Sequence, residues 1–494
     1  MKKILMLYPE FPDTFWSFKH ALKFIHKRAA LPPLGLLTVA AMLPSHWEKR
    51  LIDLNVADLG EADLAWADLV LISGMIAQRD AARTLIARCR AAGKTVLAGG
   101  PLFTSEHADF PEVDHFILNE AEVTLPEFLH DFEAGRPRRL YNTTVLPDLT
   151  ETPVPLWALA DLRRYGSMCL QYSRGCPFDC EFCDVTAKFG HRSRTKSAAQ
   201  VLAELEALAA AGWRGPVFFV DDNFIGNKRK LREDLLPALN AWQNARHHRF
   251  SFYTEASINL ADDEALTRDM VAAGFDAVFI GIETPLEAGL AECNKRQNRN
   301  RDLLEDIRRL QHAGLEVQGG FIVGFDSDTL SIFRSQLEFI QKSGIVTAMV
   351  GMLTALPGTK LFERLQREGR LLGPSSGNNS DGTTNFLPRM DLQALRDGYR
   401  NLIASIYAPR PYYRRVRTFL REFHPPKLSL RFNPKALAAF ARSAVSLGVI
   451  GRERFQYWRL LAWTLFRRPS LFQMAVKLAI YGHHFRRCAD AVAR

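Results

Sequence analysis

Residues 176–183 read Cys176-Pro-Phe-Asp-Cys180-Glu-Phe-Cys183, and this stretch decides the fold and chemistry that we expect. Iron–sulfur clusters are held by cysteine thiolates. Three thiolates on one loop can therefore hold three irons of a cubane cluster and leave the fourth iron open. A structural zinc site would need a fourth ligand, usually from a second Cys or His pair. His191 is nearby, but the spacing is not that of a zinc ribbon, and a chance grouping of structural cysteines is the remaining alternative.

The other cysteines and the N-terminus indicate the compartment. The chain has seven cysteines, an odd number, and three of them crowd into residues 176–183. This is not a disulfide framework. The start, MKKILMLYPEF, has an apolar run too short for a signal peptide, and no stretch is long and apolar enough to span a membrane. We therefore expect a cytoplasmic protein without a membrane-spanning helix.

The cysteine loop follows the first strand of a repeated strand–helix series. Apolar strands are predicted over residues 168–172, 217–220, 250–254, 277–282, 316–323 and 347–353, with helices between them such as 198–211 and 231–245. Units of this length predict a full or partial β/α barrel over residues 147–372, beginning with a Pro-containing linker. The active site of such a barrel lies at the carboxyl ends of its strands.

A second α/β domain precedes the barrel, over residues 1–146. Short apolar strands are predicted at 4–8, 50–54, 69–73, 95–98 and 115–118, and helices at 34–43, 80–92 and 125–133. This alternation predicts a doubly wound parallel sheet, in which ligands bind beyond the carboxyl ends of the strands. The candidate ligand contacts at those ends are Ser73, Gly74, Gly99, Gly100 and Glu120.

The remaining region, residues 373–494, begins with a loop rich in Gly and Ser and continues with helical patterns only. The chain carries 64 Lys+Arg and 54 Asp+Glu, a net charge of +10. Residues 409–494 hold 18 Lys/Arg and three Asp/Glu, which is +15, so the first 408 residues carry −5. The sequence is therefore an acidic body with a basic helical tail.

The predicted tail helices span residues 435–447, 454–466 and 471–485. In the second of these, apolar residues recur at helical spacing: Tyr457, Trp458, Leu461, Ala462, Leu465 and Phe466. Basic helices with such a face suit an anionic lipid surface. The alternative is that the apolar faces pack on the barrel. No platform of stacking aromatic residues is evident, so nucleic acid is not expected as a partner.

The CxxxCxxC motif, with Phe182 before its last cysteine, resembles the radical S-adenosylmethionine (SAM) superfamily. The resemblance implies that Cys176, Cys180 and Cys183 hold a 4Fe–4S cluster whose open iron chelates SAM. Reduction then cleaves SAM to a 5′-deoxyadenosyl radical. Six residues occupy the positions of the family's cofactor-binding motifs: Phe182, Asp221, Asp222, Asn223, Glu255 and Glu283. Asp221-Asp222-Asn223 departs from the usual Gly-Gly-Glu, and strand-end packing is the alternative role for each.

The first domain resembles the cobalamin-binding domain found in front of such barrels. The resemblance rests on Pro32-Pro33-Leu34-Gly35, Gly99-Gly100-Pro101 and Asn119-Glu-Ala-Glu122. No Asp-x-His-x-x-Gly segment is present, so the resemblance implies cobalamin without a protein histidine ligand. A degenerate domain that binds no cobalamin is the competing interpretation.

The full chain is similar to cobalamin-dependent radical SAM enzymes, in particular the subgroup of hopanoid C-2 methylases. This implies a C-methyltransferase acting on an unactivated carbon of a small-molecule or lipid-like substrate. It also implies an electron donor such as flavodoxin or ferredoxin, and the tail suggests peripheral contact with the inner face of an anionic membrane. Cyclisation, hydroxylation or rearrangement is the first alternative; a non-catalytic iron–sulfur redox sensor or scaffold at the membrane is the second.

Overall fold

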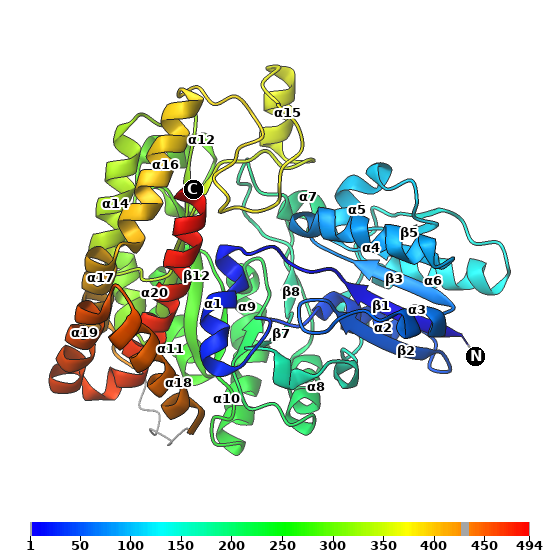
Figure 1. The fold of residues 1–494 in the computed structure, drawn as a ribbon, viewed down its shortest axis with the longest axis horizontal. Helices are drawn as coiled ribbons and strands as arrows, with labels where there is room; N and C mark the ends of the chain where they lie inside the picture. The colour runs from blue at the N-terminus through cyan, green and yellow to red at the C-terminus, as the bar shows by residue number, and fades with distance from the viewer. Residues whose placement is uncertain (1, 426–433, 494) are drawn as a thin grey trace.

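The computed structural model describes residues 2–425 and 434–493, which form two parallel α/β sheets and a C-terminal group of helices (Figure 1). This confirms the predicted fold class. Of the basic tail residues, Lys427, Arg431 and Arg494 lie outside the described residues.

The first sheet has the strand order β2-β1-β3-β4-β5-β6, and all of its pairs are parallel. Its strands are β1 (Lys3–Tyr8), β2 (Glu48–Asp53), β3 (Leu69–Ser73), β4 (Thr95–Gly99), β5 (His115–Ile117) and β6 (Leu140–Tyr141). Side chains alternate between two cores: Leu5 and Leu7 enter one, Ile4 and Met6 the other. Since both faces are covered, the central strands β1, β3 and β4 read as continuous apolar runs, whereas the edge strand β2 begins with three charged residues.

Helices cover both faces of this sheet, and the prediction missed the shorter ones. The helices are α2 (Leu34–Met42), α3 (Glu61–Trp66), α4 (Arg79–Ala91), α5 (Pro101–Glu106) and α6 (Ala121–Glu133). The short helix α1 (Lys19–Leu22) packs instead against the C-terminal helix α20 (Phe472–Ala493). The sequence did not predict α3 and α5, each six residues long, or the two-residue strand β6. Elements this short carry too few residues to show a period.

The second sheet has the order β14-β13-β12-β11-β10-β7, again all parallel. Its strands are β7 (Met168–Leu170), β10 (Val217–Phe219), β11 (Phe252–Glu255), β12 (Phe275–Glu283), β13 (Glu316–Val323) and β14 (Ala348–Met352). Within the described residues β7 and β14 do not pair with each other, so the sheet is a partial barrel with two edges. A two-stranded antiparallel pair, β8 (Ser173–Arg174) and β9 (Arg194–Thr195), follows β7.

Helices connect the strands of the barrel. They are α7 (Val185–Phe189), α8 (Ala198–Ala210), α9 (Lys228–Lys230), α10 (Leu236–Ala245), α11 (Glu264–Ala272), α12 (Glu287–Glu292), α13 (Leu303–His312), α14 (Ser331–Ser343) and α15 (Lys360–Arg367). The carboxyl ends of β7, β10, β11 and β12 therefore meet at one end of the barrel, where a site is expected.

The tail folds back along the barrel as α16 (Leu392–Tyr407), α17 (Pro409–Glu422), α18 (Pro434–Val445), α19 (Arg454–Arg467) and α20 (Phe472–Ala493). Two polar contacts fix it to the strands. The Tyr407 hydroxyl donates to the Ala348 carbonyl at 2.6 Å, and Lys477 Nζ lies 2.7 Å from Glu316 Oε2. The buried faces of the tail helices thus pack on the barrel, which is one of the two predicted alternatives.

The apolar positions predicted as one face of α19 are divided in the structure. Tyr457 and Leu461 are buried, whereas Trp458, Leu465 and Phe466 are exposed. A helix that packs against its neighbours buries only the side that faces them. The apolar residues of α19 cover more of the helix surface than that side. No helix in the described part of the chain is long and apolar enough to cross a membrane.

Candidate functional site

The cysteine loop leaves β8 and is closed at its base by β9. Gly175, directly before Cys176, has φ +94, and a Cβ on it would lie 2.8 Å from the Arg192 carbonyl oxygen. The Cys176 N–H donates to the Gly190 carbonyl at 3.3 Å. The loop is thereby folded onto residues 189–192, which requires glycine at this position because a side chain has no space there.

The three cysteines of the loop are partly buried, and none forms a disulfide. Asn223 Nδ2 donates to Cys176 Sγ, and Gln297 Nε2 donates to Cys180 Sγ, each at 3.8 Å. Burial raises the pKa of Cys183 to about 12. Across residues 2–425 and 434–493, no three His, Cys, Asp or Glu side chains are grouped closely enough to hold one metal ion.

A buried ion pair lies beside the cysteines. Lys295 Nζ is 2.6 Å from Glu283 Oε1, and both side chains are largely buried. Glu283 ends β12 with φ +63, where the β12–β13 register shifts. Although burial opposes the charge of Lys295, Glu283 and then Cys180 raise its pKa above the ordinary value. Lys295 is therefore positively charged and lies beside the cysteines.

Sequence reasoning missed Lys295 and Gln297. Both lie between α12 and α13, in the segment that follows the carboxyl end of β12. The available signal was their position in a βα connection of the barrel, where functional residues concentrate. A single lysine or glutamine there carries no further pattern.

Asp221, Asp222 and Asn223 follow β10, and the structure gives them different surroundings. Asp221 is buried and accepts hydrogen bonds from the Tyr172 N–H at 3.1 Å and the Ser173 hydroxyl at 2.6 Å. Its oxygens thus hold the segment that leads to the cysteine loop. Asn223 Oδ1 accepts from the Ser257 N–H at 3.2 Å, which orients its amide toward Cys176.

Asp222 and Glu255 have fewer partners. Asp222 accepts one long hydrogen bond, from the Gly175 N–H at 3.4 Å, and burial raises its pKa to about 6. Glu255 ends β11, and its carboxyl group makes no hydrogen bond to another described residue. Burial, followed by the charges of Asp222 and Asp221, raises the pKa of Glu255 to about 8. Carboxyl groups without internal partners at a strand end are available to a ligand.

Phe182, inside the cysteine loop, packs against Phe325, with ring centroids 6.5 Å apart. Phe182 joins a small core that also contains Cys293, Leu361 and Leu365. The aromatic ring therefore fixes the middle of the loop onto the segment after β13.

A cavity of about 680 Å³ lies between the first sheet and the barrel. All five candidate contacts of the first domain line it: Ser73, Gly74, Gly99, Gly100 and Glu120. From the barrel side come Cys169, Gln171, Arg174, Lys196 and Val220. None of the lining residues in the described part of the chain is a histidine.

Gly100 shapes the wall of this cavity. It has φ +88, and a Cβ on it would lie 2.4 Å from the Ser73 hydroxyl oxygen. The turn after β4 therefore requires a residue without a side chain, and its bare backbone faces the cavity. Such a glycine turn at strand ends lets a ligand approach the backbone closely.

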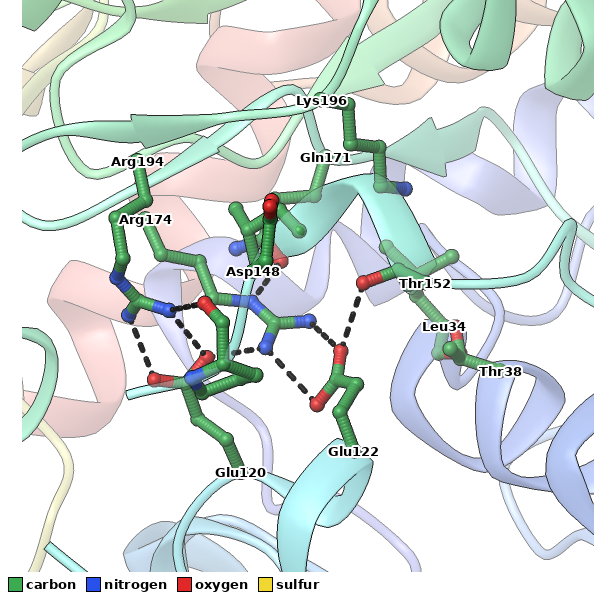
Figure 2. A network of polar contacts seen from close by, with 12 residues as sticks. Leu34, Thr38, Glu120, Glu122, Asp148, Thr152, Gln171, Arg174, Arg194 and Lys196 are labelled. Carbon is green, nitrogen blue, oxygen red and sulfur yellow. Dashed lines mark hydrogen bonds and ion pairs between the residues drawn. The ribbon is translucent and has the colours of Figure 1, made fainter. Parts of the chain in front are cut away.

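Ion pairs join the two domains at the wall of the cavity (Figure 2). Glu120 is paired with Arg174 and with Arg194, whose Nη2 lies 2.6 Å from Glu120 Oε1. Arg174 Nη2 also donates to Glu122 Oε1 at 2.8 Å, and this oxygen accepts from Thr152 Oγ1 at 3.0 Å. Arg174 and Arg194 lie on β8 and β9, which bracket the cysteine loop.

Sequence reasoning placed Glu120 at the cavity but missed Glu122, Arg174 and Arg194 as its partners. The pairs join residues 52 to 74 positions apart, so no local pattern predicts them. The structure thus brings the candidate residues together in two groups. One group surrounds the cysteines, the other lines the cavity, and Arg174 connects them.

Comparisons with known proteins agree with this division. The B12-binding domain matches residues 27–129, and the radical SAM superfamily matches residues 170–340. A domain of unknown function matches residues 359–494.

Two curated relatives span nearly the whole chain. An uncharacterized methyltransferase of Synechocystis sp. is 41% identical, with 99% of this chain and 92% of the relative covered. Hopanoid C-2 methylase of Rhodopseudomonas palustris is 32% identical, with 98% and 93% covered.

Solved structures share the fold. The radical SAM methyltransferase TsrM from Kitasatospora setae, with cobalamin and a [4Fe-4S] cluster bound, matches with a TM-score of 0.63 at 15% identity, covering 100% of both chains. The cobalamin-dependent radical SAM enzyme OxsB, with aqua-cobalamin and SAM bound, also matches with a TM-score of 0.63 at 14% identity, covering 100% of this chain and 84% of that one. This chain belongs to the family of cobalamin-dependent radical SAM methyltransferases.

Proposed function

We propose that this enzyme methylates an unactivated carbon of a lipid-like substrate, with hopanoid-type C-methylation as the best match. The observation that carries the proposal is the position of Arg174. It pairs with Glu120 and Glu122 of the first domain and lies two residues before Cys176. The cavity of the first domain and the cysteine loop are thus held next to each other. The similarity to hopanoid C-2 methylase of R. palustris supports the choice of substrate class.

In this proposal Cys176, Cys180 and Cys183 hold the 4Fe–4S cluster. Asn223 and Gln297 donate hydrogen bonds toward two of the three sulfurs, and such bonds tune a cluster. When bound, the cluster and cobalamin would supply electron transfer to SAM and delivery of a methyl group. The chain itself provides binding, orientation and exclusion of water.

SAM is expected at the strand ends beside the cysteines. Asp222 and Glu255 have carboxyl oxygens without strong internal partners, which suits the cationic and hydroxyl groups of SAM. Glu283 acts through Lys295, to which it is paired, and Asn223 acts through Cys176. Phe182 orients the loop, and Asp221 supports the segment before it.

Cobalamin is expected in the cavity of about 680 Å³. Ser73, Gly74, Gly99 and Gly100 would approach it through their backbone, while Glu120 holds the wall. Because the lining residues described include no histidine, we expect no protein histidine on the cobalt. The domain bounds that accompany this proposal are residues 1–146, 147–372 and 373–494.

The proposal also includes the partners of the enzyme. A flavodoxin or ferredoxin would deliver the electron, and the basic tail would contact an anionic membrane from the cytoplasmic side. The exposed apolar residues of α19 support the membrane contact.

Lipids from a deletion strain, compared by mass with those of the parent, test the substrate. A lipid that lacks one methyl group in the deletion strain, and regains it with the wild-type gene, supports the proposal. Complementation with a gene encoding Cys176→Ala, Cys180→Ala and Cys183→Ala must fail, whereas Cys488→Ala, a cysteine outside the loop, must restore the methyl group. Unchanged lipids would overturn the substrate class.

A further inference from the structure

The tail carries a hollow lined by arginines that the proposed chemistry does not use. Its volume is about 410 Å³, and it lies between α17 and α19. The lining residues are Arg410, Pro411, Arg414, Arg417, Gln456 and Arg459. On α17 the three arginines are spaced four and three residues apart, which places them on one side of the helix.

These four arginines have no ion-pair partner among the described residues. Elsewhere in the tail, basic residues are paired: Lys477 with Glu316, and Arg486 with Glu453. Burial, and then the charges of Arg459, Arg421 and Arg414, lower the pKa of Arg417, and no carboxylate contributes. Like charges gathered without a counter-charge are stabilised when an anion binds between them.

Exposed aromatic side chains flank the hollow. Phe455 is 73% exposed and Phe466 is 84% exposed. They lie four residues before and seven after Arg459, so all three side chains share one face of α19. Ile450, 75% exposed, precedes the same helix. Large apolar residues that remain in water beside a cationic hollow indicate a surface that is covered in use.

The position of this face agrees with a role separate from the reaction. In Figure 1, α17 and α19 lie at the edge of the molecule away from β1–β5. Among the described residues, none that lines the hollow also lines the cavity of the first domain. The hollow is thus a second binding feature and not an extension of the cofactor site.

We propose that the α17–α19 face docks on a membrane that contains anionic phospholipid. The hollow receives the headgroup phosphates, and Phe455 and Phe466 enter the interface. Arginine pairs with phosphate through planar, bidentate hydrogen bonds, and aromatic residues favour the interface. This docking surface rests on the proposed function, because it specifies the membrane contact included there. It does not depend on which substrate accepts the methyl group.

Vesicle flotation of the full-length protein tests this face. One set of vesicles is phosphatidylcholine alone; in the other, phosphatidylglycerol makes up about a third of the lipid. We expect the wild-type protein to bind the anionic vesicles and to bind the neutral vesicles much more weakly. Each arginine near an anionic surface contributes about fivefold to partitioning. The variant Arg414→Gln, Arg417→Gln, Arg459→Gln should therefore bind anionic vesicles about a hundredfold less.

A control variant matches this loss of charge. Arg136, Arg229 and Arg268 are exposed, form no ion pair within the described part of the chain and lie outside the tail. Their triple change to Gln should leave vesicle binding within about twofold of wild type, since it removes the same charge from other surfaces. A further variant, Phe455→Ser with Phe466→Ser, should retain a preference for anionic lipid but bind less.

Three results would overturn the inference. The first is equal vesicle binding by the hollow variant and the control variant. The second is equal binding of the wild-type protein to both vesicle types. The third is a hollow variant that loses binding to a DNA oligonucleotide but still binds vesicles. Thermal melting confirms that each variant is folded. Methyl transfer is measured separately in detergent. If methyl transfer fails while vesicle binding is intact, the proposed reaction alone is refuted. If vesicle binding fails while methyl transfer is intact, the docking surface alone is refuted.

Discussion

Glu120 of the first domain is held by Arg174 and by Arg194, whose guanidinium lies 2.6 Å from the carboxylate. The side chain of Glu120 is 3% exposed, so this is a buried contact between the two domains. Buried charges are costly when one partner is removed, because the others stay buried without a counter-charge.

Glu120→Gln is expected to weaken the junction of the domains. It leaves Arg194 without a charged partner and Arg174 with Glu122 alone, and we expect a loss of about 2 kcal/mol, with a fall in Tm of several degrees. Cobalamin affinity, measured by titration, should fall as well, because Glu120 lines the cavity. The control is Glu112→Gln, because Glu112 is exposed and forms no ion pair with another described residue. If both variants melt and bind cobalamin alike, the junction has no role.

Gly100→Ala is expected to impair the cavity. Its Cβ would lie 2.4 Å from the Ser73 hydroxyl oxygen, so the β4 turn must shift. Gly93 also has positive φ, at +68, but a Cβ there meets nothing within 4 Å. Gly93→Ala therefore carries only the backbone strain, about 1 kcal/mol, and should bind cobalamin as the wild type does. Equal cobalamin affinities of the two variants would show that this turn does not shape the ligand site.

Lys295 is expected to set the reduction potential of the cluster. Its charge lies near Cys180 and Cys183, whose thiolates contribute to its raised pKa. Lys295→Met combined with Glu283→Gln removes the ion pair without leaving a buried charge. The variant removes a cation and an anion together, but Lys295 has the larger influence on Cys180 and also acts on Cys183. The net change therefore disfavours the electron, and the potential should fall by less than about 60 mV. Redox titration followed by electron paramagnetic resonance measures it; an unchanged potential would place Lys295 outside the reach of the cluster.

Glu255 is expected to make stability depend on pH. In the folded protein its pKa is about 8, against an ordinary value of about 4.5. The folded state therefore binds the proton more tightly than the unfolded state. The resulting stabilisation is complete below about pH 4.5 and is lost as the pH rises through about 8.

Glu255→Gln is expected to remove this pH dependence. The variant should be more stable than the wild type by several kcal/mol above pH 8, with the difference shrinking toward pH 5. Thermal melting of the protein without SAM across this range measures the effect. Parallel melting curves for the two proteins at every pH would contradict an elevated pKa of Glu255.

Local patterns predicted the parts of the site that are contiguous in sequence. The three cysteines lie within eight residues, and most strands of both sheets are short, largely apolar runs. Strand ends in turn located Glu255, Glu283 and Gly100. Sequence could not distinguish Asp221, which is satisfied by the backbone of Tyr172 and Ser173, from Asp222, which is not.

Contacts between distant segments could not be read from the sequence. The pairs Glu120–Arg194 and Glu122–Arg174 depend on how two domains meet, which no period or spacing encodes. In the tail, helical spacing identified the apolar residues of α19, but only packing separates buried Tyr457 from exposed Phe466. The arginine hollow likewise exists only because α17 lies against α19.

The central claim is methyl transfer from SAM to a lipid carbon, and one measurement tests it most directly. The reconstituted protein is incubated without oxygen with a reductant, methyl-labelled SAM and lipid extract from the deletion strain. We expect the labelled methyl group in a lipid product, with 5′-deoxyadenosine and S-adenosylhomocysteine formed together. Formation of 5′-deoxyadenosine with neither S-adenosylhomocysteine nor labelled lipid would contradict methyl transfer and leave another radical reaction at this site.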